Sequence, residues 1–305
     1  MGPSPARRVR TSPLRGEAKI GSLRGRQGDR SLELREATRR WVPAFVTVCP
    51  VLEAIIADAE TRAEAARDNA AHLRTLARSA PPARGFAARL GAAGNSVVAE
   101  IKRRSPSRGP LAPGLDAAAQ ARRYENGGAA AISVLTEPDH FDGSLDDLIE
   151  VVAVTDLPVL RKDFLFDPAQ VWESRAAGAD AVLLIVAVLG PQLLASMIET
   201  AGEAALDALV EVHDESEAEM ALTAGARLIG VNNRDLATFA VDLGVSERLS
   251  GTVKQPGVIA VAESGVSDPV AAGRMWALGY DAILVGEVLV TASDPEDVLS
   301  RLVTP

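Results

Sequence analysis

The stretch AGADAVLLIV, residues 177–186, joins the end of a helix to a buried strand. We expect the helix to end at Gly178, and the apolar run that follows extends over Ala181–Val188. The same joint returns at Ala224-Gly225-Ala226 and at Leu278-Gly279-Tyr280. A repeated glycine helix end followed by a short apolar run is typical of a chain built from β/α units.

Short apolar runs recur about every 20–30 residues along the chain. They are Val97–Ile101, Ala129–Leu135, Leu157–Leu160, Ala181–Val188, Leu206–Val210, Leu228–Val231, Val258–Val261 and Ala282–Val285. Helix-like stretches are expected between them near 116–127, 144–154, 168–178, 191–204, 215–225, 243–250, 268–279 and 294–303. Eight buried strands alternating with helices predict an α/β fold of the (β/α)8 or TIM-barrel type.

Several of these helices carry start signals. Asp167-Pro168, Asp268-Pro269 and Asp294-Pro295 each place Asp at the N-cap and Pro at the first helical position. One more helix is expected before the first strand, over 51–76, because its apolar residues follow a three-to-four spacing. From its place in the chain, we expect it to cover the amino-terminal mouth of the barrel.

Residues 1–46 differ from the rest of the chain. They are rich in Arg, Gly, Ser and Pro and lack an apolar face, so we predict a disordered Arg-rich extension before a barrel over 47–305. Three interpretations remain open: an organelle transit peptide, a basic tail that touches nucleic acid, or a start codon assigned too far upstream. We favour the last, with translation beginning near Val46, Val48 or Val51.

A chain that starts at Thr47 is therefore expected to keep full activity and nearly the same melting temperature. Ordering residues 1–46 would cost entropy with little burial to offset it, and exposed charge pairs are worth little. Mass spectrometry of the natively expressed protein would show where it begins. A full-length extension whose removal lowers activity several-fold would contradict this interpretation.

Composition narrows the class of protein. The net charge is −9, and residues 1–41 carry 11 Lys and Arg against 4 Asp and Glu, so the remainder is strongly acidic and does not suggest a nucleic-acid partner. The longest strictly apolar run, Ala181–Leu189, is too short to cross a bilayer. A single cysteine, Cys49, favours a reducing compartment, and we expect a cytoplasmic protein, monomeric or weakly self-associating.

Polar residues follow the predicted strands where each one ends. They are Glu100, Lys102, Lys162, Glu211 and Asn232. In barrels of this type the carboxyl ends of the strands carry the active site. Two lysines balance two glutamates here, which should keep all four ionised and let the pKa of one lysine fall toward the working range. Such a ring suits chemistry that needs a proton donor and a proton acceptor around one substrate.

One orientation stays open at the third strand, where either Arg161 and Asp163 or Lys162 and Phe164 face inward. The last two strands end in Ser264-Gly265 and Gly286-Glu287, and glycines at this strand pair leave backbone N–H groups open to a phosphate. Three scattered histidines do not suggest a metal site, and the chain has neither a dinucleotide-binding glycine motif after a strand nor a P-loop.

Six motifs in chain order resemble indole-3-glycerol phosphate synthase, over about residues 50–303. They are Glu100-Ile101-Lys102-Arg103-Arg104-Ser105-Pro106-Ser107, Ser133-Val134-Leu135-Thr136-Glu137, Leu160-Arg161-Lys162-Asp163-Phe164, Val210-Glu211-Val212-His213-Asp214, Gly230-Val231-Asn232-Asn233-Arg234-Asp235-Leu236 and Ala262-Glu263-Ser264-Gly265.

The resemblance implies closure of a phosphorylated small molecule, 1-(2-carboxyphenylamino)-1-deoxyribulose 5-phosphate, to indole-3-glycerol phosphate, with loss of CO2 and water. The family uses no cofactor or metal. By resemblance, Lys162 is the general acid of ring closure, Lys102 holds the substrate carboxylate, and Glu211 is the acid/base of dehydration. Which lysine delivers which proton stays open.

The remaining site residues are carried over in the same way. Glu100 and Asn232 would orient hydroxyl groups, and an apolar wall would hold the aromatic ring. That wall would consist of Phe141, Phe164 and Leu184, and the phosphate side would consist of Ser105, Arg234, Ser264, Gly265, Gly286 and Glu287. Residues 1–46 lie outside the resemblance.

Two rival enzymes and one non-enzyme compete with this interpretation. A phosphoribosylanthranilate isomerase would need a cysteine base at the end of the first strand, where this chain has Glu100 and Lys102. A pentose-phosphate epimerase would need His and Asp metal ligands on several strands. A non-catalytic binding protein would not need the polar ring. A test of whether the protein converts substrate distinguishes it from an enzyme.

Overall fold

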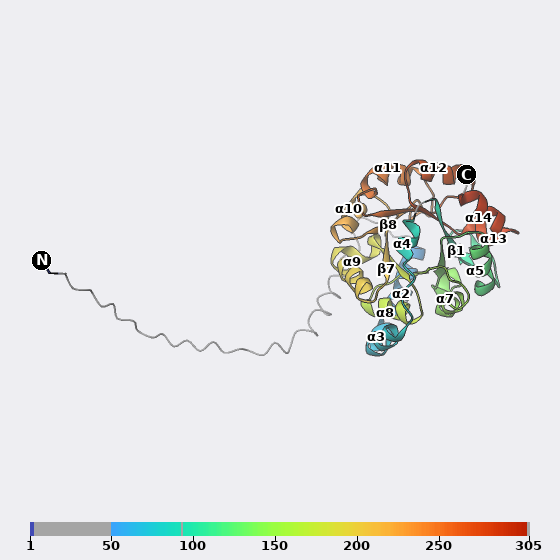
Figure 1. Ribbon diagram of the computed structural model, residues 1–305. Helices are drawn as coiled ribbons and strands as arrows, with labels where there is room; N and C mark the ends of the chain where they lie inside the picture. The colour runs from blue at the N-terminus through green and yellow to red at the C-terminus, as the bar shows by residue number, and fades with distance from the viewer. Residues whose placement is uncertain (3–49, 93, 304–305) are drawn as a thin grey trace.

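Eight parallel strands form a closed barrel in this computed structural model (Figure 1), which describes residues 1–2, 50–92 and 94–303. Around the barrel the order is β1-β10-β9-β8-β7-β6-β5-β4, so each strand lies beside its neighbour in the chain. The strands are β1 (Ser96–Ile101), β4 (Ala131–Leu135), β5 (Val159–Lys162), β6 (Ala181–Ile185), β7 (Asp207–Val212), β8 (Leu228–Asn232), β9 (Ile259–Glu263) and β10 (Ala282–Val285). The predicted barrel is confirmed.

The helices lie outside the barrel strands and bury the strands' outer faces. They are α5 (Ala117–Asn126), α7 (Leu145–Val152), α8 (Pro168–Ala176), α9 (Val186–Glu203), α10 (Glu215–Thr223), α11 (Gly244–Val253), α12 (Pro269–Ala277) and α14 (Pro295–Val303). The predicted joints are confirmed, because Gly178, Gly225 and Gly279 all have positive φ, at 90°, 91° and 83°. The caps at Asp167 and Asp268 are also present, and each carboxylate accepts a backbone N–H of its helix.

The strand core is apolar and shielded on both faces. Every residue of β1, β4, β6, β8 and β10 is buried, which is why these strands read as continuous apolar runs rather than alternating ones. Low aromatic content means that aliphatic side chains fill the interior, among them Val97, Ile132 and Leu209.

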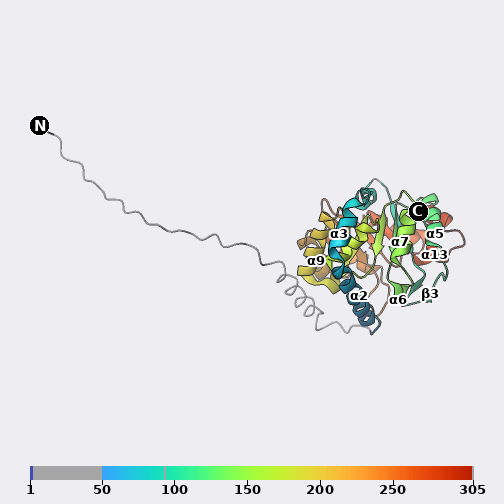
Figure 2. The same cartoon turned by 90° about the horizontal axis from the view of Figure 1, so that it is seen from below.

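The helix before the first strand differs from the prediction in two ways. It is two helices, α2 (Pro50–Asp68) and α3 (Ala70–Ser79), which meet at Asn69. It also does not cover the amino-terminal mouth, because α3 lies along the outside of the barrel and α2 extends toward the opposite, carboxyl end, as Figure 2 shows. Arg62 on α2 pairs with Glu137 and Asp163, which follow the carboxyl ends of β4 and β5.

The amino-terminal mouth is covered instead by α4 (Phe86–Leu90), a short helix absent from the prediction. The backbone N–H of Ala87 donates to Asp207 Oδ2 at the start of β7, and the Leu90 carbonyl accepts from Ser96 Oγ at the start of β1. The side chains of Phe86 and Leu90 are fully buried. The physical reason for the difference is that an amphipathic pattern shows that a helix packs, but not which surface it packs on.

Further short elements border the carboxyl mouth. They are the hairpin β2 (Arg104–Ser105) and β3 (Gly109–Pro110), α6 (Pro138–Phe141) and α13 (Glu287–Thr291). The expected helix over 191–204 starts earlier, at Val186, with a break at Gly190. No helix among the described residues is long and apolar enough to cross a membrane. The extension predicted over 1–46 falls almost entirely on residues 3–49, outside those described.

Candidate functional site

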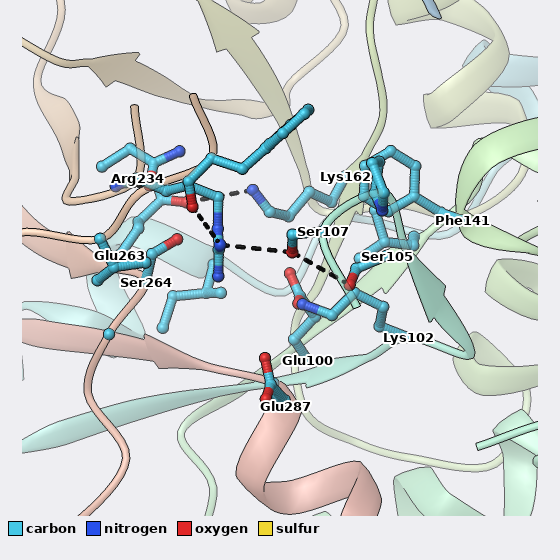
Figure 3. A pocket seen from close by; sticks show the side chains of 18 of the residues that line it. Glu100, Lys102, Ser105, Ser107, Phe141, Lys162, Arg234, Glu263, Ser264 and Glu287 are labelled. Atoms are coloured by element: carbon cyan, nitrogen blue, oxygen red, sulfur yellow. Dashed lines mark hydrogen bonds and ion pairs between the residues drawn. The ribbon is translucent and has the colours of Figure 1, made fainter. Parts of the chain in front are cut away.

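A cavity of about 530 Å³ opens at the carboxyl ends of the barrel strands. Figure 3 shows side chains from β1, β5, β9 and the intervening loops converging on it. All the residues expected in the site except Leu184 line it: Glu100, Lys102, Ser105, Phe141, Lys162, Phe164, Glu211, Asn232, Arg234, Ser264, Gly265, Gly286 and Glu287. The strand ends thus bring together residues that are far apart in the chain.

The expectation for Leu184 is corrected by strand alternation. Leu183 and Ile185 of β6 line the cavity, whereas Leu184 between them is fully buried and does not. Successive side chains of a strand point to opposite faces, so only one of these two sets can face the barrel interior.

The open orientation at β5 is also resolved. Lys162 and Phe164 line the cavity, as does Asp163 just beyond the end of the strand, while Arg161 is buried away from it. The Arg161 guanidinium pairs with Asp163 at 3.2 Å and with Glu173 of α8 at 2.8 Å. Arg161 therefore ties β5 to its own helix, and this anchors the strand end that carries Lys162.

Two ion-pair groups line the cavity. In the first, Lys102 Nζ lies 2.6 Å from Glu100 Oε1, both from the end of β1. In the second, Lys162 Nζ lies 3.4 Å from Glu211 Oε2 and 3.2 Å from Glu263 Oε2. One lysine shared by two buried carboxylates is the central electrostatic feature of the site.

The pKa of Lys162 is opposite to the expectation. Burial opposes its charge, but attraction by Glu263, Glu211 and Glu100 outweighs burial and holds its pKa above the usual range. Lys162 is therefore an ammonium ion throughout the neutral range. The expected fall in a lysine pKa is wrong here because a third carboxylate joins the two that the strand ends predict.

That third carboxylate is Glu263, which was not among the expected site residues. Burial raises its pKa to about 7, and Glu211 opposes its ionisation further, although Lys162 pulls the other way. Burial also penalises charge on Glu211, yet Lys162 and His213 lower the pKa of Glu211 to about 2. The two carboxylates therefore differ in direction: burial holds the pKa of Glu263 above its usual range, and Lys162 and His213 hold the pKa of Glu211 below it.

Strand alternation could have found Glu263. It ends β9 directly before the Ser264-Gly265 turn, and a glutamate at the carboxyl end of a barrel strand is a site candidate. The Glu263 carboxylate fits beside β8 only because residue 230 is a glycine. A Cβ at Gly230 would overlap Glu263 Oε1. Glycine at 230 is therefore needed for the carboxylate to reach Lys162.

Glu263 should make stability depend on pH in a defined window. Its folded pKa of about 7 lies above an unfolded value of about 4.3, so the folded state binds more protons between the two. This contribution is fully present below the unfolded pKa and is lost as pH rises through about 7. Relative to Glu263→Gln, the wild-type free energy of unfolding should fall by on the order of 1–3 kcal/mol between about pH 4.5 and pH 8.

Urea unfolding at several pH values measures this difference, and the exposed Glu199→Gln serves as the control. Glu211 does not interfere, because its lowered pKa places its titration below the window. Parallel pH profiles for wild type and Glu263→Gln would show that Glu263 has an ordinary pKa.

The side of the cavity formed by the turns after β9 and β10 can receive an anion. Ser264 and Gly265 both have positive φ, 62° and 84°, and the buried Asn233 side chain donates to the carbonyls of Glu263 and Ser264, which holds this turn. Such left-handed turns direct backbone N–H groups toward a bound anion.

Two flanking loops complete this side. Arg234 Nη1 lies 3.5 Å from Ser107 Oγ, which in turn lies 3.5 Å from Ser105 Oγ, and Figure 3 shows the three in a row. Glu287 is paired with Arg108 of the β2–β3 hairpin at 3.2 Å, which offsets its negative charge near the anion side.

The part of the chain that the structure describes contains no group of three or more His, Cys, Asp or Glu arranged to hold a metal ion. The two lysines at the centre of the cavity are instead paired with its glutamates.

Solved structures share the fold at low sequence identity. One 3-hexulose-6-phosphate synthase matches with a TM-score of 0.54 at 16% identity, covering 68% of this chain and 97% of that one. A thiamine phosphate pyrophosphorylase from Pyrococcus furiosus matches with a TM-score of 0.51 at 20% identity, covering 70% of this chain and 95% of the other. These likenesses support the barrel fold alone.

Sequence relatives are more specific. The chain is 49% identical over 256 residues to "Indole-3-glycerol phosphate synthase 2" of Streptomyces coelicolor, covering 83% of this chain and 98% of the relative. It is 49% identical over 254 residues to the "Indole-3-glycerol phosphate synthase" of a Parafrankia species, covering 83% and 94%. The family model described as indole-3-glycerol phosphate synthase matches residues 52–302. The chain therefore belongs to the indole-3-glycerol phosphate synthase family.

Proposed function

We propose that this protein is a carbon–carbon lyase, a carboxy-lyase, that makes indole-3-glycerol phosphate in tryptophan biosynthesis. Its substrate is 1-(2-carboxyphenylamino)-1-deoxyribulose 5-phosphate, which closes to the indole with loss of CO2 and water. Family membership supports the reaction. The single structural observation that carries it is Lys162, an ammonium ion between two buried carboxylates in the cavity that the Glu100–Lys102 pair also lines.

Ring closure needs an acid on the substrate ketone, because the aryl carbon that attacks it is a weak nucleophile. Lys162 is the donor in this proposal, since its ammonium group points into the cavity and cannot lose its proton to bulk solvent at neutral pH. Lys102, at the end of β1, lines the same cavity and holds the substrate carboxylate until CO2 leaves and aromaticity returns.

Dehydration completes the reaction and needs a base as well as an acid. Glu211 is ionised at neutral pH and sits against Lys162, so it can take the proton that the cyclised intermediate must lose. Glu100 and Asn232 flank the same space and orient the hydroxyl group, which takes a proton from one of the two lysines and departs as water.

The ends of the substrate would lie along opposite sides of the cavity. The rings of Phe141 and Phe164 lie 6.4 Å apart at an interplanar angle of 37°, and they form an apolar wall for the anthranilate ring. The turn at Ser264 and Gly265, together with Gly286, Ser105 and Arg234, receives the phosphate.

Direct turnover tests the proposal. The full chain is incubated with the carboxyphenylamino-deoxyribulose phosphate, and indoleglycerol fluorescence is followed with time. We expect multiple turnovers without added metal and competitive inhibition by inorganic phosphate. A folded protein that binds phosphate but never forms indoleglycerol phosphate would overturn the proposal.

A further inference from the structure

A largely buried imidazole lies between two carboxylates next to the catalytic cavity. His213 directly follows β7, and its Nδ1 lies 3.0 Å from Glu217 Oε2 of α10. Its Nε2 lies 3.4 Å from Glu211 Oε1. The backbone N–H of His213 also donates to Glu217 Oε2 at 2.7 Å, so Glu217 holds both the ring and the main chain of this residue. The proposed reaction leaves His213 without a role.

The Nε2 atom is the part of this arrangement that needs explanation. It is buried and closes no hydrogen bond of good geometry, although Glu211 Oε1 lies beside it. A buried donor left unpaired is destabilising, and catalytic hydrogen bonds are often long before substrate binds. The ring therefore points its free nitrogen at the carboxylate that the reaction needs as a base.

The charge state of the ring fits a donor at both nitrogens. Burial would lower the pKa of His213, but the adjacent carboxylates of Glu211 and Glu217 favour the charged ring, outweigh burial and raise the pKa to about 10. The imidazole is therefore protonated at neutral pH and can donate to both carboxylates at once.

Other charged groups around His213 come from the loop after β8 and from α11, which follows it. Beyond the ring lies a second cavity of about 330 Å³, which His213 lines together with Asp235, Asp242 and Arg248. Arg248 and Asp242 pair with each other at 3.4 Å, and both side chains are more than half exposed. Asp235 accepts hydrogen bonds from its own loop. Glu211 and Glu217 therefore dominate the environment of the ring.

We propose that His213 is a positioning residue for Glu211. Its Nε2–H holds Oε1, so that Oε2 stays turned toward Lys162 and the substrate, and its positive charge keeps the carboxylate ionised between turnovers. This inference deepens the proposed function and rests on it for the identity of the reaction. The three-residue array Glu217–His213–Glu211 would then act as a unit, in which the carboxylate remote from the substrate orients the imidazole.

Removing the positive charge should weaken Glu211 as a base in acid. Since His213 helps to lower the pKa of Glu211, its loss raises that pKa. The acid limb of the pH–kcat/KM profile should then move to higher pH in His213→Ala by about one unit or more. We expect kcat at neutral pH to fall about tenfold or more, with KM changed less than about threefold, because Glu211 loses the orientation that His213 gives it, and a misplaced catalytic group can cost up to about 10²-fold in rate.

A second variant separates orientation from charge. His213→Gln keeps an N–H donor at similar reach but carries no charge, so it should recover most of kcat while its acid limb stays shifted. His72→Asn is the matched control, because His72 is exposed on α3 and far along the chain from the site. If the acid limb stays in place while activity falls in parallel with melting temperature, His213 is only structural and the proposal is overturned.

Imidazole NMR gives a readout that does not depend on turnover. The chain has three histidines, so the His213 signal is assigned by its loss in His213→Gln. We expect it to remain protonated up to about pH 9 and to titrate at lower pH in Glu211→Gln. A His213 that titrates near the ordinary value of about 6.5 would overturn the proposal. If the wild-type protein does not convert the substrate, the proposed function is rejected. The NMR titration would still decide whether the His213 ring is paired with Glu211.

Discussion

Replacing Lys162 by alanine is expected to lower kcat by roughly 10²–10⁴-fold, the range typical of a lost general acid. The reason lies in its position at the end of β5, where its ammonium group faces the cavity between Glu211 and Glu263. Alanine supplies neither the proton for the substrate ketone nor the cation that holds these carboxylates in place. Steady-state indoleglycerol fluorescence measures the effect.

The fold should survive this change. Without Lys162, two buried carboxylates face each other, and Glu263, whose pKa already stands near 7, takes up a proton and removes most of the repulsion. Lys254→Ala is the control, since Lys254 forms a partly exposed ion pair with Asp281 away from the cavity. Turnover within a few-fold of wild type in folded Lys162→Ala would remove Lys162 from the mechanism.

The second large effect is expected for Gly286→Val, which should lower kcat/KM by roughly 10²-fold or more. A Cβ at this position would overlap Glu100 Oε1 and lie 3.1 Å from Glu100 Cβ, so the side chain must displace Glu100 from Lys102. A displacement of about 1 Å at a catalytic group can cost about 10²-fold in rate. The two branches of valine would also obstruct the phosphate side of the cavity, so KM should rise.

The backbone conformation contributes little to this effect. The φ of Gly286 is −126°, a value open to other residues and not the positive φ that often requires glycine in a turn. Glycine is needed here for close approach and not for a left-handed turn. Inorganic phosphate should lose its competitive inhibition of Gly286→Val, and Gly251→Val is the control because a Cβ at 251 meets nothing within 4 Å. Unchanged inhibition by phosphate would place the anion elsewhere.

Some features of the site follow directly from local sequence. Apolar runs that end in a polar residue mark buried strands whose carboxyl ends meet at one mouth, so the amino-acid sequence is enough to place Lys102, Lys162 and Glu211 together. Glycines after short helices mark the joints, and N-cap aspartates mark helix starts, because both act through the few residues around them. These interactions join residues that are close in the sequence, so they can be predicted from the sequence alone.

Tertiary structure decided what depends on contacts between distant segments. The pKa of Lys162 could not be predicted correctly without Glu263, which is 101 residues away in the chain and reaches the lysine only because Gly230 has no side chain. Tertiary structure also decided which face each element turns toward the barrel. It set where α2 packs, and it placed Leu183 and Ile185 in the cavity in place of the expected Leu184. Sequence alone determined the barrel and most of the residues at its mouth. The electrostatic state of those residues arose only when eight strand ends were brought within a few ångströms, because Coulomb energies depend on distance in space and not on separation along the chain.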